Sequence, residues 1–223
     1  MAADRSGFDH PIFSESIRLI RAALADPQAS HSFALQSLQP LEQEVVLRLV
    51  HSSGDLTLAA DVRFSEGACE AGLRALAAGA TILTDTAMAA AAVAPMARRT
   101  FQNAVQSVLD WAPPKAPPGS TRAAAGMERA LQEHPGAVVL VGSAPTALEL
   151  LLDQVAAGLT PTPALVIGMP VGFVGVAESK RHLAESDLPQ IRLEGSRGGA
   201  GLVGAAANAL LRRAWLDQVT LEP

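Results

Sequence analysis

His51 is the side chain of this sequence best suited to transfer a proton. It ends an apolar run at residues 45–50, and the polar stretch Ser52-Ser53-Gly54-Asp55 that follows is typical of a helix end. An imidazole titrates near neutral pH, so a histidine at a helix end can hold or release a proton at the edge of a cleft. A histidine that only caps its helix is the alternative, and the residues alone leave both interpretations open.

Turns that begin with a glycine follow three short apolar runs of the chain. They lie at residues 142–148, 168–180 and 195–199, and the second is the longest and carries three glycines. Glycine lets the main chain approach a ligand closely, and ligands of open α/β sheets bind beyond the carboxyl ends of the strands. The turns therefore predict a site at that edge, although many glycine turns only reverse the chain.

Hydrophobic periodicity predicts the elements that must position these residues. Apolar residues three and four positions apart predict helices at residues 12–24, 41–50, 69–78, 123–131, 146–155 and 202–215. Short apolar runs bounded by glycine, proline or a charge predict strands at residues 80–84, 138–141, 165–167 and 191–193. Residues 101–109 are a weaker fifth strand.

Strands that alternate with helices predict an α/β fold of three layers, α/β/α, with a mostly parallel, Rossmann-like central sheet. The first seventy or so residues are almost wholly helical in pattern, and residues 1–9 are expected to be disordered. Residues 111–119 contain four prolines and predict a surface loop. Residues 1–223 are expected to form one domain, because neither half alone has enough strands for a sheet.

Composition narrows the classes of function. The formal net charge of -5 and the pI near 5.5 argue against a nucleic-acid groove built on bulk positive charge. No stretch has the length of a membrane span and the N-terminus lacks the apolar core of a signal peptide, so we expect a cytoplasmic protein. The five histidines show no zinc-site spacing, and the single cysteine, Cys69, is expected to pack as a small apolar group.

Two motifs carry a resemblance to a known family. The turn Gly168-Met169-Pro170-Val171-Gly172-Phe173-Val174, closed by Glu178-Ser179-Lys180, and the turn at residues 142–148 resemble precorrin-8X methylmutases, and the likeness runs from about residue 10 to 215. The resemblance implies an isomerase of the cobalamin pathway that moves a methyl group from C11 to C12 of a tetrapyrrole. It also implies a homodimer, and no methyl donor, metal or other cofactor.

The resemblance implies roles for individual residues. His51 matches the catalytic histidine, which would act as a general acid. Ser16 on the first helix, and Asp85 after a strand, match residues that face the substrate; an ordinary polar helix position and a plain helix N-cap are their respective alternatives. The remaining predicted substrate-binding residues are Arg122, Ser143, Gly172, Phe173, Lys180, Arg197, Gly198 and Gly199.

The last turn departs from the family pattern. Ser196 stands where the family has an arginine, and Arg197 follows one place later, so a small shift of the turn could let Arg197 replace it. In the second motif, Ser143 replaces an asparagine. These departures keep open a tetrapyrrole-binding protein without catalysis. A nucleotide-binding protein is a weaker alternative, because the chain has neither a Walker lysine motif nor a G-x-G-x-x-G helix start.

Overall fold

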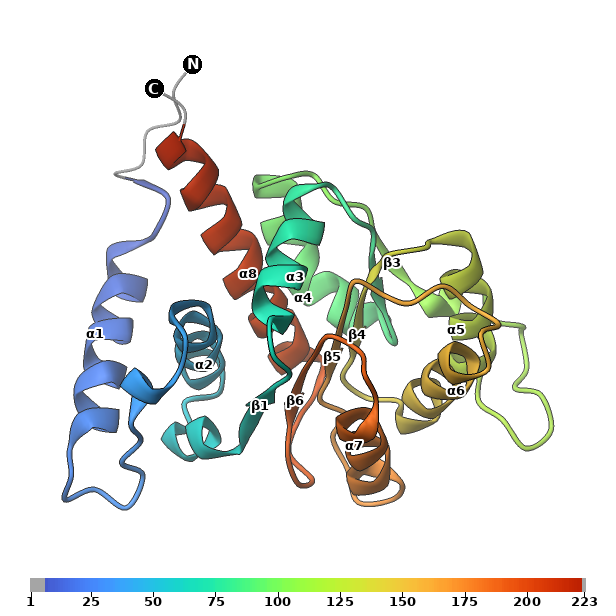
Figure 1. Ribbon diagram of the computed structural model, residues 1–223, viewed down its shortest axis with the longest axis horizontal. Coiled ribbons are helices and arrows are strands. Elements are labelled where there is room, and N and C mark those ends of the chain that lie inside the picture. The colour runs from blue at the N-terminus through green and yellow to red at the C-terminus, as the bar shows by residue number, and fades with distance from the viewer. Residues whose placement is uncertain (1–6, 222–223) are drawn as a thin grey trace.

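The computed structural model describes residues 7–221 and has a six-stranded sheet at its centre (Figure 1). The strands are β1 (Val62–Phe64), β2 (Ile82–Thr84), β3 (Val105–Ser107), β4 (Val138–Val141), β5 (Leu165–Gly168) and β6 (Gln190–Leu193). The α-helices are α1 (Pro11–Ala25), α2 (Pro40–Ser53), α3 (Ala68–Ala77), α4 (Ala87–Arg99), α5 (Arg122–Glu133), α6 (Pro145–Ala156), α7 (Val176–Glu185) and α8 (Ala200–Leu221). Short 3-10 helices are η2 (Leu35–Ser37), η3 (Leu56–Asp61) and η4 (Val108–Asp110).

The sheet has the strand order β1-β6-β5-β4-β2-β3, and every neighbouring pair is parallel except β1 with β6. This confirms the predicted α/β fold with a mostly parallel sheet. The expectation of an almost wholly helical N-terminal segment is wrong at β1, where Val62 pairs with Leu193. Strand β1 is only three residues long and lies at the sheet edge, so its side chains leave no periodic pattern to read.

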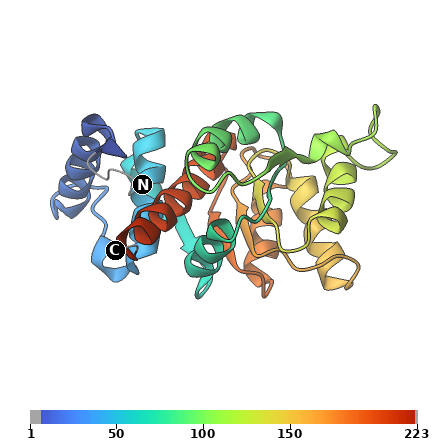
Figure 2. The same cartoon turned by 90° about the horizontal axis from the view of Figure 1, so that it is seen from above.

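Side chains alternate between the two faces of each strand and so build two cores. Val138 and Leu140 of β4 join the core beneath α2, α3, α4 and α8, whereas Val139 and Val141 join the core beneath α5, α6 and α7. Figures 1 and 2 show the three layers, with α8 running along one face and α1 outermost, beyond α2. In the N-terminal segment, helix α2 packs against α8, and α8 in turn packs against strands β4 and β5 of the sheet.

The four main predicted strands are present, and the weak fifth is shorter than expected. Residues 101–109 contain only β3 and part of η4, while residues 111–121 contain no helix or strand, in agreement with the predicted loop. The first six residues of the segment expected to be disordered lie outside the described residues. Asp9 accepts hydrogen bonds from Arg212. No helix among residues 7–221 is long and apolar enough to cross a membrane.

The side of the sheet on which the next strand is added changes between β2 and β4, although the two strands are parallel. The connection through α4 carries β2 to β3 on one side, whereas the connection through α6 carries β4 to β5 on the other. Ligands of such sheets bind in the crevice outside the carboxyl ends of the strands, at this switch point. The loops after β2, β4, β5 and β6 all leave the sheet at this edge, because the four strands are parallel.

Candidate active site

Ser16 and His51 meet at the interface of α1 and α2. The Ser16 Oγ lies 2.7 Å from the His51 Nδ1, although the two residues are 35 positions apart in the sequence. Helices α1 and α2 lie side by side at one end of the molecule (Figures 1 and 2). His51 is in the last turn of α2, which ends at Gly54 in the left-handed conformation that glycine adopts readily. Ser16 therefore bonds to a defined partner, His51, whereas an ordinary polar helix residue would face solvent alone.

The His51 ring lies in a shallow cavity of about 260 Å³. Its second nitrogen, Nε2, has no hydrogen-bond partner among residues 7–221. The Phe13 ring packs edge-on against the imidazole at 5.1 Å between centroids. Burial, with the positive charge of Arg48, lowers the pKa of His51 below its usual value. The cavity is lined by Ser16, Leu19, Ile20, Ala23, Val50, His51, Gly54 and Leu56.

Arg197 joins the last turn to the segment that follows His51. Its guanidinium donates to Asp55 Oδ2 at 2.6 Å and to Thr57 Oγ1 at 2.7 Å, and it pairs with Asp61. Strand β1 runs antiparallel to β6, so Asp61 lies beside the carboxyl end of β6, where the last turn begins. Arg197 therefore has three protein partners. A carboxylate of a substrate would have to compete with them.

Lys180 is buried beneath the same turn, with only 3% of its surface exposed. Its Nζ donates to the backbone oxygens of Gly195 at 2.7 Å and Arg197 at 2.6 Å. Burial lowers the pKa of this ammonium group from 10.5 to about 8, although the charge of Asp61 opposes the decrease. Lys180 thus fixes the shape of the turn that carries Arg197, and its Nζ points at main-chain oxygens.

Asp85 bridges the switch-point crevice. Its Oδ2 accepts hydrogen bonds from the backbone N–H groups of Gly142 at 3.0 Å, Ser143 at 2.5 Å and Ala144 at 2.8 Å. The prediction of a plain N-cap is wrong, because Thr86 caps α4 through its hydroxyl. Burial raises the pKa of Asp85, and the three amides oppose that increase.

The amides at the start of α6 are therefore engaged by a carboxylate of the protein itself. The N–H groups of Gly142, Ser143 and Ala144 all donate to Asp85, so they are not free to bind a ligand. Helix N-termini bind phosphate through such amides. This position is thus closed to a phosphate group, which weakens the nucleotide-binding alternative.

The glycines of the edge loops allow close approach of one backbone to another. Gly198 lies against the carbonyl of Met169, where a Cβ atom would come within 2.0 Å of the oxygen. The Gly199 N–H donates to Met169 O at 2.9 Å and the Gly172 N–H donates to Ser196 O at 3.0 Å. Gly172 and Gly199 have φ angles of 138° and 125°, which side chains rarely tolerate. The turns after β5 and β6 therefore form one connected rim.

Large apolar side chains project from this rim into solvent. Phe173 is 95% exposed, and its neighbour Val174 is 88% exposed. Met88, at the start of α4, and Ile12, on α1, are also mostly exposed. Arg122, at the start of α5, is exposed as well and donates from its Nε to Pro113 O at 2.9 Å. Phe173 and Val174 are adjacent in the chain, so this loop offers an apolar surface that a ligand or a partner can cover.

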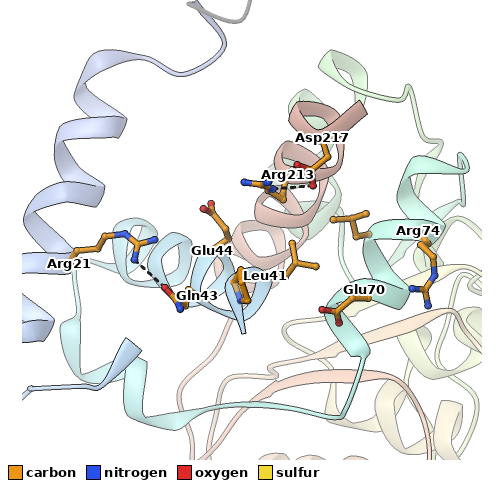
Figure 3. Close-up of a pocket in the computed structure, with 10 residues that line it drawn as sticks. Arg21, Leu41, Gln43, Glu44, Glu70, Arg74, Arg213 and Asp217 are labelled. Atoms are coloured by element: carbon orange, nitrogen blue, oxygen red, sulfur yellow. Dashed lines mark hydrogen bonds and ion pairs between the residues drawn. The ribbon is translucent and has the colours of Figure 1, made fainter. Parts of the chain in front are cut away.

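A second cleft, of about 410 Å³, lies away from this rim (Figure 3). It is bordered by the first turn of α2, at the opposite end of that helix from His51, and by the second half of α8. Within this cleft Arg213 pairs with Asp217, and Arg21 donates a hydrogen bond to the side-chain oxygen of Gln43. The candidate site is the His51 cavity with the adjoining rim, because the predicted residues Ser16, His51 and Arg197 lie there.

The described residues offer no obvious metal centre. Within residues 7–221, no three His, Cys, Asp or Glu side chains are grouped so that they could hold an ion. Cys69 is 1% exposed and unbonded to another cysteine, and burial raises the pKa of its thiol. This agrees with the prediction that Cys69 packs as a small apolar group.

Comparison with known proteins identifies the family. The chain matches the family described as precorrin-8X methylmutase over residues 11–213. The chain belongs to the precorrin-8X methylmutase family. It is thus an isomerase of cobalamin biosynthesis that moves a methyl group within its substrate.

Individual relatives of the methylmutase family cover most of the chain. A cobalt-precorrin-8 methylmutase of Synechocystis sp. is 36% identical over 223 residues, covering 94% of this chain and 98% of the relative. A precorrin-8X methylmutase of Pseudomonas aeruginosa is 43% identical over 173 residues, or 75% of this chain and 82% of the relative. The solved precorrin-8X methylmutase of Thermus thermophilus has a TM-score of 0.79 at 42% identity and covers 94% of this chain and 99% of its own.

Sequence reasoning missed several residues of this candidate site. Asp55 and Asp61 hold Arg197, and Arg48 and Phe13 border His51. Arg48 could have been found, because it precedes His51 by three positions and so shares its helix face. The partners of Arg197 could not, since they are more than 130 positions away in the chain.

Proposed function

We propose that His51 is the general acid of a methyl migration from C11 to C12 of a tetrapyrrole, precorrin-8X or cobalt-precorrin-8. The observation that carries the proposal is the contact of Ser16 Oγ with His51 Nδ1 at a cavity that both residues line, which leaves Nε2 available to a ligand. A hydroxyl can accept from the imidazolium Nδ1–H and can donate to the neutral ring. Ser16 therefore orients His51 in both protonation states.

The reaction conserves all atoms. The bond from C11 to the methyl carbon breaks, the bond from C12 to that carbon forms, and the ring double bonds rearrange. A proton that Nε2 donates to the ring C nitrogen draws electrons toward that nitrogen and assists the migration. Because the product is an isomer of the substrate, His51 regains a proton as the product forms. The side chains of the protein thus need only to bind the ring, orient it and protonate it.

A tetrapyrrole is too large for the His51 cavity alone. Cavities that hold drug-sized ligands measure about 300–1,000 Å³, whereas this one measures about 260 Å³. A second shallow depression, lined by Pro11, Ile12 and Glu15, shares Ser16 and Leu19 with it. The ring would therefore extend over α1 and toward the exposed Phe173. Arg122 would bind a peripheral carboxylate.

A homodimer is part of the proposal. The resemblance to the family implies it, and the exposed apolar residues of α1 and of the rim support it. A second copy that covers these residues would complete the walls of the open cavity. Sedimentation or light scattering of the purified protein tests this, and a monomer at working concentration would refute it.

The test of His51 is conversion of the methylmutase substrate, followed by visible absorption. We expect turnover by the wild type and a loss of about 10²–10⁴-fold in kcat in His51→Ala, with binding of the ring retained. Wild-type rates in His51→Ala would refute the acid. Binding without turnover in both proteins would favour the tetrapyrrole-binding alternative, which the engagement of Arg197 by Asp55 and Asp61 also favours.

A further inference from the structure

One wall of the His51 cavity has little support from its own segment. Gly54 and Leu56 line the cavity where α2 ends and η3 begins, and residues 54–57 are here called the α2–η3 wall. None of these four residues is buried, because the buried residues of η3 come only after them. Segments with few buried contacts open at a low free energy. Contacts from other parts of the chain therefore decide how firmly this wall is held.

Arg197 contacts the α2–η3 wall from the last turn. One guanidinium nitrogen donates to Asp55 Oδ2 at 2.6 Å and to Thr57 Oγ1 at 2.7 Å, and the other pairs with Asp61. The Thr57 hydroxyl in turn donates to Asp55 Oδ1 at 2.6 Å, so the three side chains close a ring of hydrogen bonds. Hydrogen bonds from Thr57, with the charge of Arg197, lower the pKa of Asp55. The Asp55 carboxylate is therefore ionised at neutral pH and forms a charged pair with Arg197.

The backbone of the last turn is itself fixed from the opposite side. Lys180 Nζ donates to the carbonyl oxygens of Gly195 and Arg197. The N–H of Gly199 donates to Met169 O at 2.9 Å, which attaches the same turn to the loop after β5. A guanidinium that two carboxylates share is also fixed in its orientation. Arg197 therefore connects a firmly held turn with a weakly held wall.

We propose that Arg197 is a positioning residue, which holds the α2–η3 wall of the His51 cavity in the shape that receives the ring. The inference rests on the proposed function, because the ring is the ligand of that cavity. A wall that is already ordered saves the free energy of ordering it when the ring binds. His51 itself lies on α2 and is oriented by Ser16, without contact to Arg197. Loss of Arg197 therefore weakens ring binding more than it slows the methyl migration.

A direct contact between Arg197 and a ring carboxylate predicts the opposite result for one substitution. Asp55→Asn keeps an oxygen that accepts from the Thr57 N–H, but it removes the charge that engages the guanidinium. If Arg197 bound the ring directly, this substitution would release the guanidinium and strengthen ring binding. If Arg197 holds the wall, Asp55→Asn weakens ring binding, as Arg197→Met does. The double substitution is then no worse than either single one.

The experiment measures ring affinity, kinetics and wall mobility for one set of variants. Affinity for the product ring, hydrogenobyrinate, is measured by absorption titration, and kcat and KM by conversion of the substrate. Amide hydrogen exchange at residues 54–58 of the free protein reports the mobility of the wall, and urea unfolding checks that each variant is folded. The variants are Arg197→Met, Arg197→Lys, Asp55→Asn and the double substitution of Arg197 by Met and Asp55 by Asn. Arg181→Met is the matched control, because Arg181 pairs with Glu185 on α7, outside the cavity lining.

We expect Arg197→Met and Asp55→Asn each to weaken ring binding by about three- to tenfold, with a matching increase in KM and a smaller change in kcat. Arg197→Lys should lose less, because lysine keeps the charge although it lacks the planar fork that reaches two carboxylates. Exchange at residues 54–58 should be faster in both Arg197→Met and Asp55→Asn and unchanged in Arg181→Met. A ring with amidated carboxylates should lose affinity to the same extent, since the variants lose the shape of the wall.

Three results overturn the inference. Tighter ring binding in Asp55→Asn makes Arg197 a direct contact of the ring, as does a loss in Arg197→Met that disappears with the amidated ring. Ring affinity and exchange that are both unchanged in Arg197→Met leave the ion pair without a role in the cavity. A wild type that neither binds nor converts the ring refutes the proposed function instead. Exchange at residues 54–58 then still shows whether Arg197 holds the wall.

Discussion

Substitution of Asp85 tests whether its carboxylate holds the start of α6 against the end of β2. In Asp85→Ala, the N–H groups of Gly142, Ser143 and Ala144 lose their common acceptor. Each buried donor left unsatisfied costs about 1–3 kcal/mol, but Ser143 and Ala144 are half-buried and can recover part of this from water. We therefore expect the free energy of unfolding to fall by about 3 kcal/mol.

Asp85→Asn is the matched control. The amide oxygen can accept from the same donors, and its nitrogen can face the hydroxyl of Thr86, which lies 3.4 Å from Asp85 Oδ1. Because burial raises the pKa of Asp85, a neutral side chain avoids the cost of an ionised one. We expect Asp85→Asn to lie within about 1 kcal/mol of wild type. As the pH rises through the pKa that Asp85 has in the folded protein, the stability of Asp85→Asn should increase relative to that of the wild type.

Urea unfolding and kcat/KM are measured together. Gly142 backs onto the main chain of Gly199 and Ala200, where an added Cβ would approach within 2.8 Å. A displaced turn should therefore disturb the last loop, and we expect lower kcat/KM in Asp85→Ala and near-normal kcat/KM in Asp85→Asn. Equal stability of Ala and Asn variants would refute the bridging role, as would an equally large loss in both.

Three further substitutions test neighbouring parts of the structure. The pKa of Lys180 is about 8 in the folded protein and about 10.5 in the unfolded chain. As the pH rises between these values, the wild type should therefore gain up to about 3 kcal/mol in free energy of unfolding relative to Lys180→Met. Urea unfolding at a series of pH values tests this, and parallel curves of stability against pH for the two proteins would contradict it. Gln102 has a φ of 58°, so Gln102→Gly should gain about 0.5–1 kcal/mol in a thermal melt, and a lower Tm would argue against strain there. Ser16→Ala should lower kcat by about tenfold in the absorption assay with ring affinity unchanged, whereas an unaltered kcat would remove Ser16 from the mechanism.

The elements that could be predicted from the sequence are those with their own pattern. Strands β4 and β5 are four-residue runs of wholly buried residues, and α5 and α6 alternate apolar and polar sides. Strand β1 has three residues, one of them Arg63, and exists only because it pairs with β6. Its pairing partner lies far along the chain, so no local pattern reports it.

For the candidate site too, the sequence predicts local features but does not reveal contacts between distant parts of the chain. The sequence marks Asp85 and Arg197 as charged residues that follow strands, and Lys180 as a residue at the start of a helix, and the structure has them there. It does not reveal that Asp85 accepts from amides 57 to 59 positions away, or that Lys180 donates to carbonyls 15 and 17 positions ahead. These partners depend on strand order and loop shape. The direct substrate contacts of these three residues stay predictions.

Helix α1 has a consequence for how activity is lost on heating. Only Leu24 of its fifteen residues is buried, so α1 is among the least anchored helices of the described chain. Elements with few buried contacts open at a lower free energy than the whole molecule. Since Ser16 is carried by α1 and His51 by α2, such local opening separates the pair while the sheet is still intact. Thermal inactivation is thus expected to precede the loss of secondary structure, with amide hydrogens of α1 exchanging first.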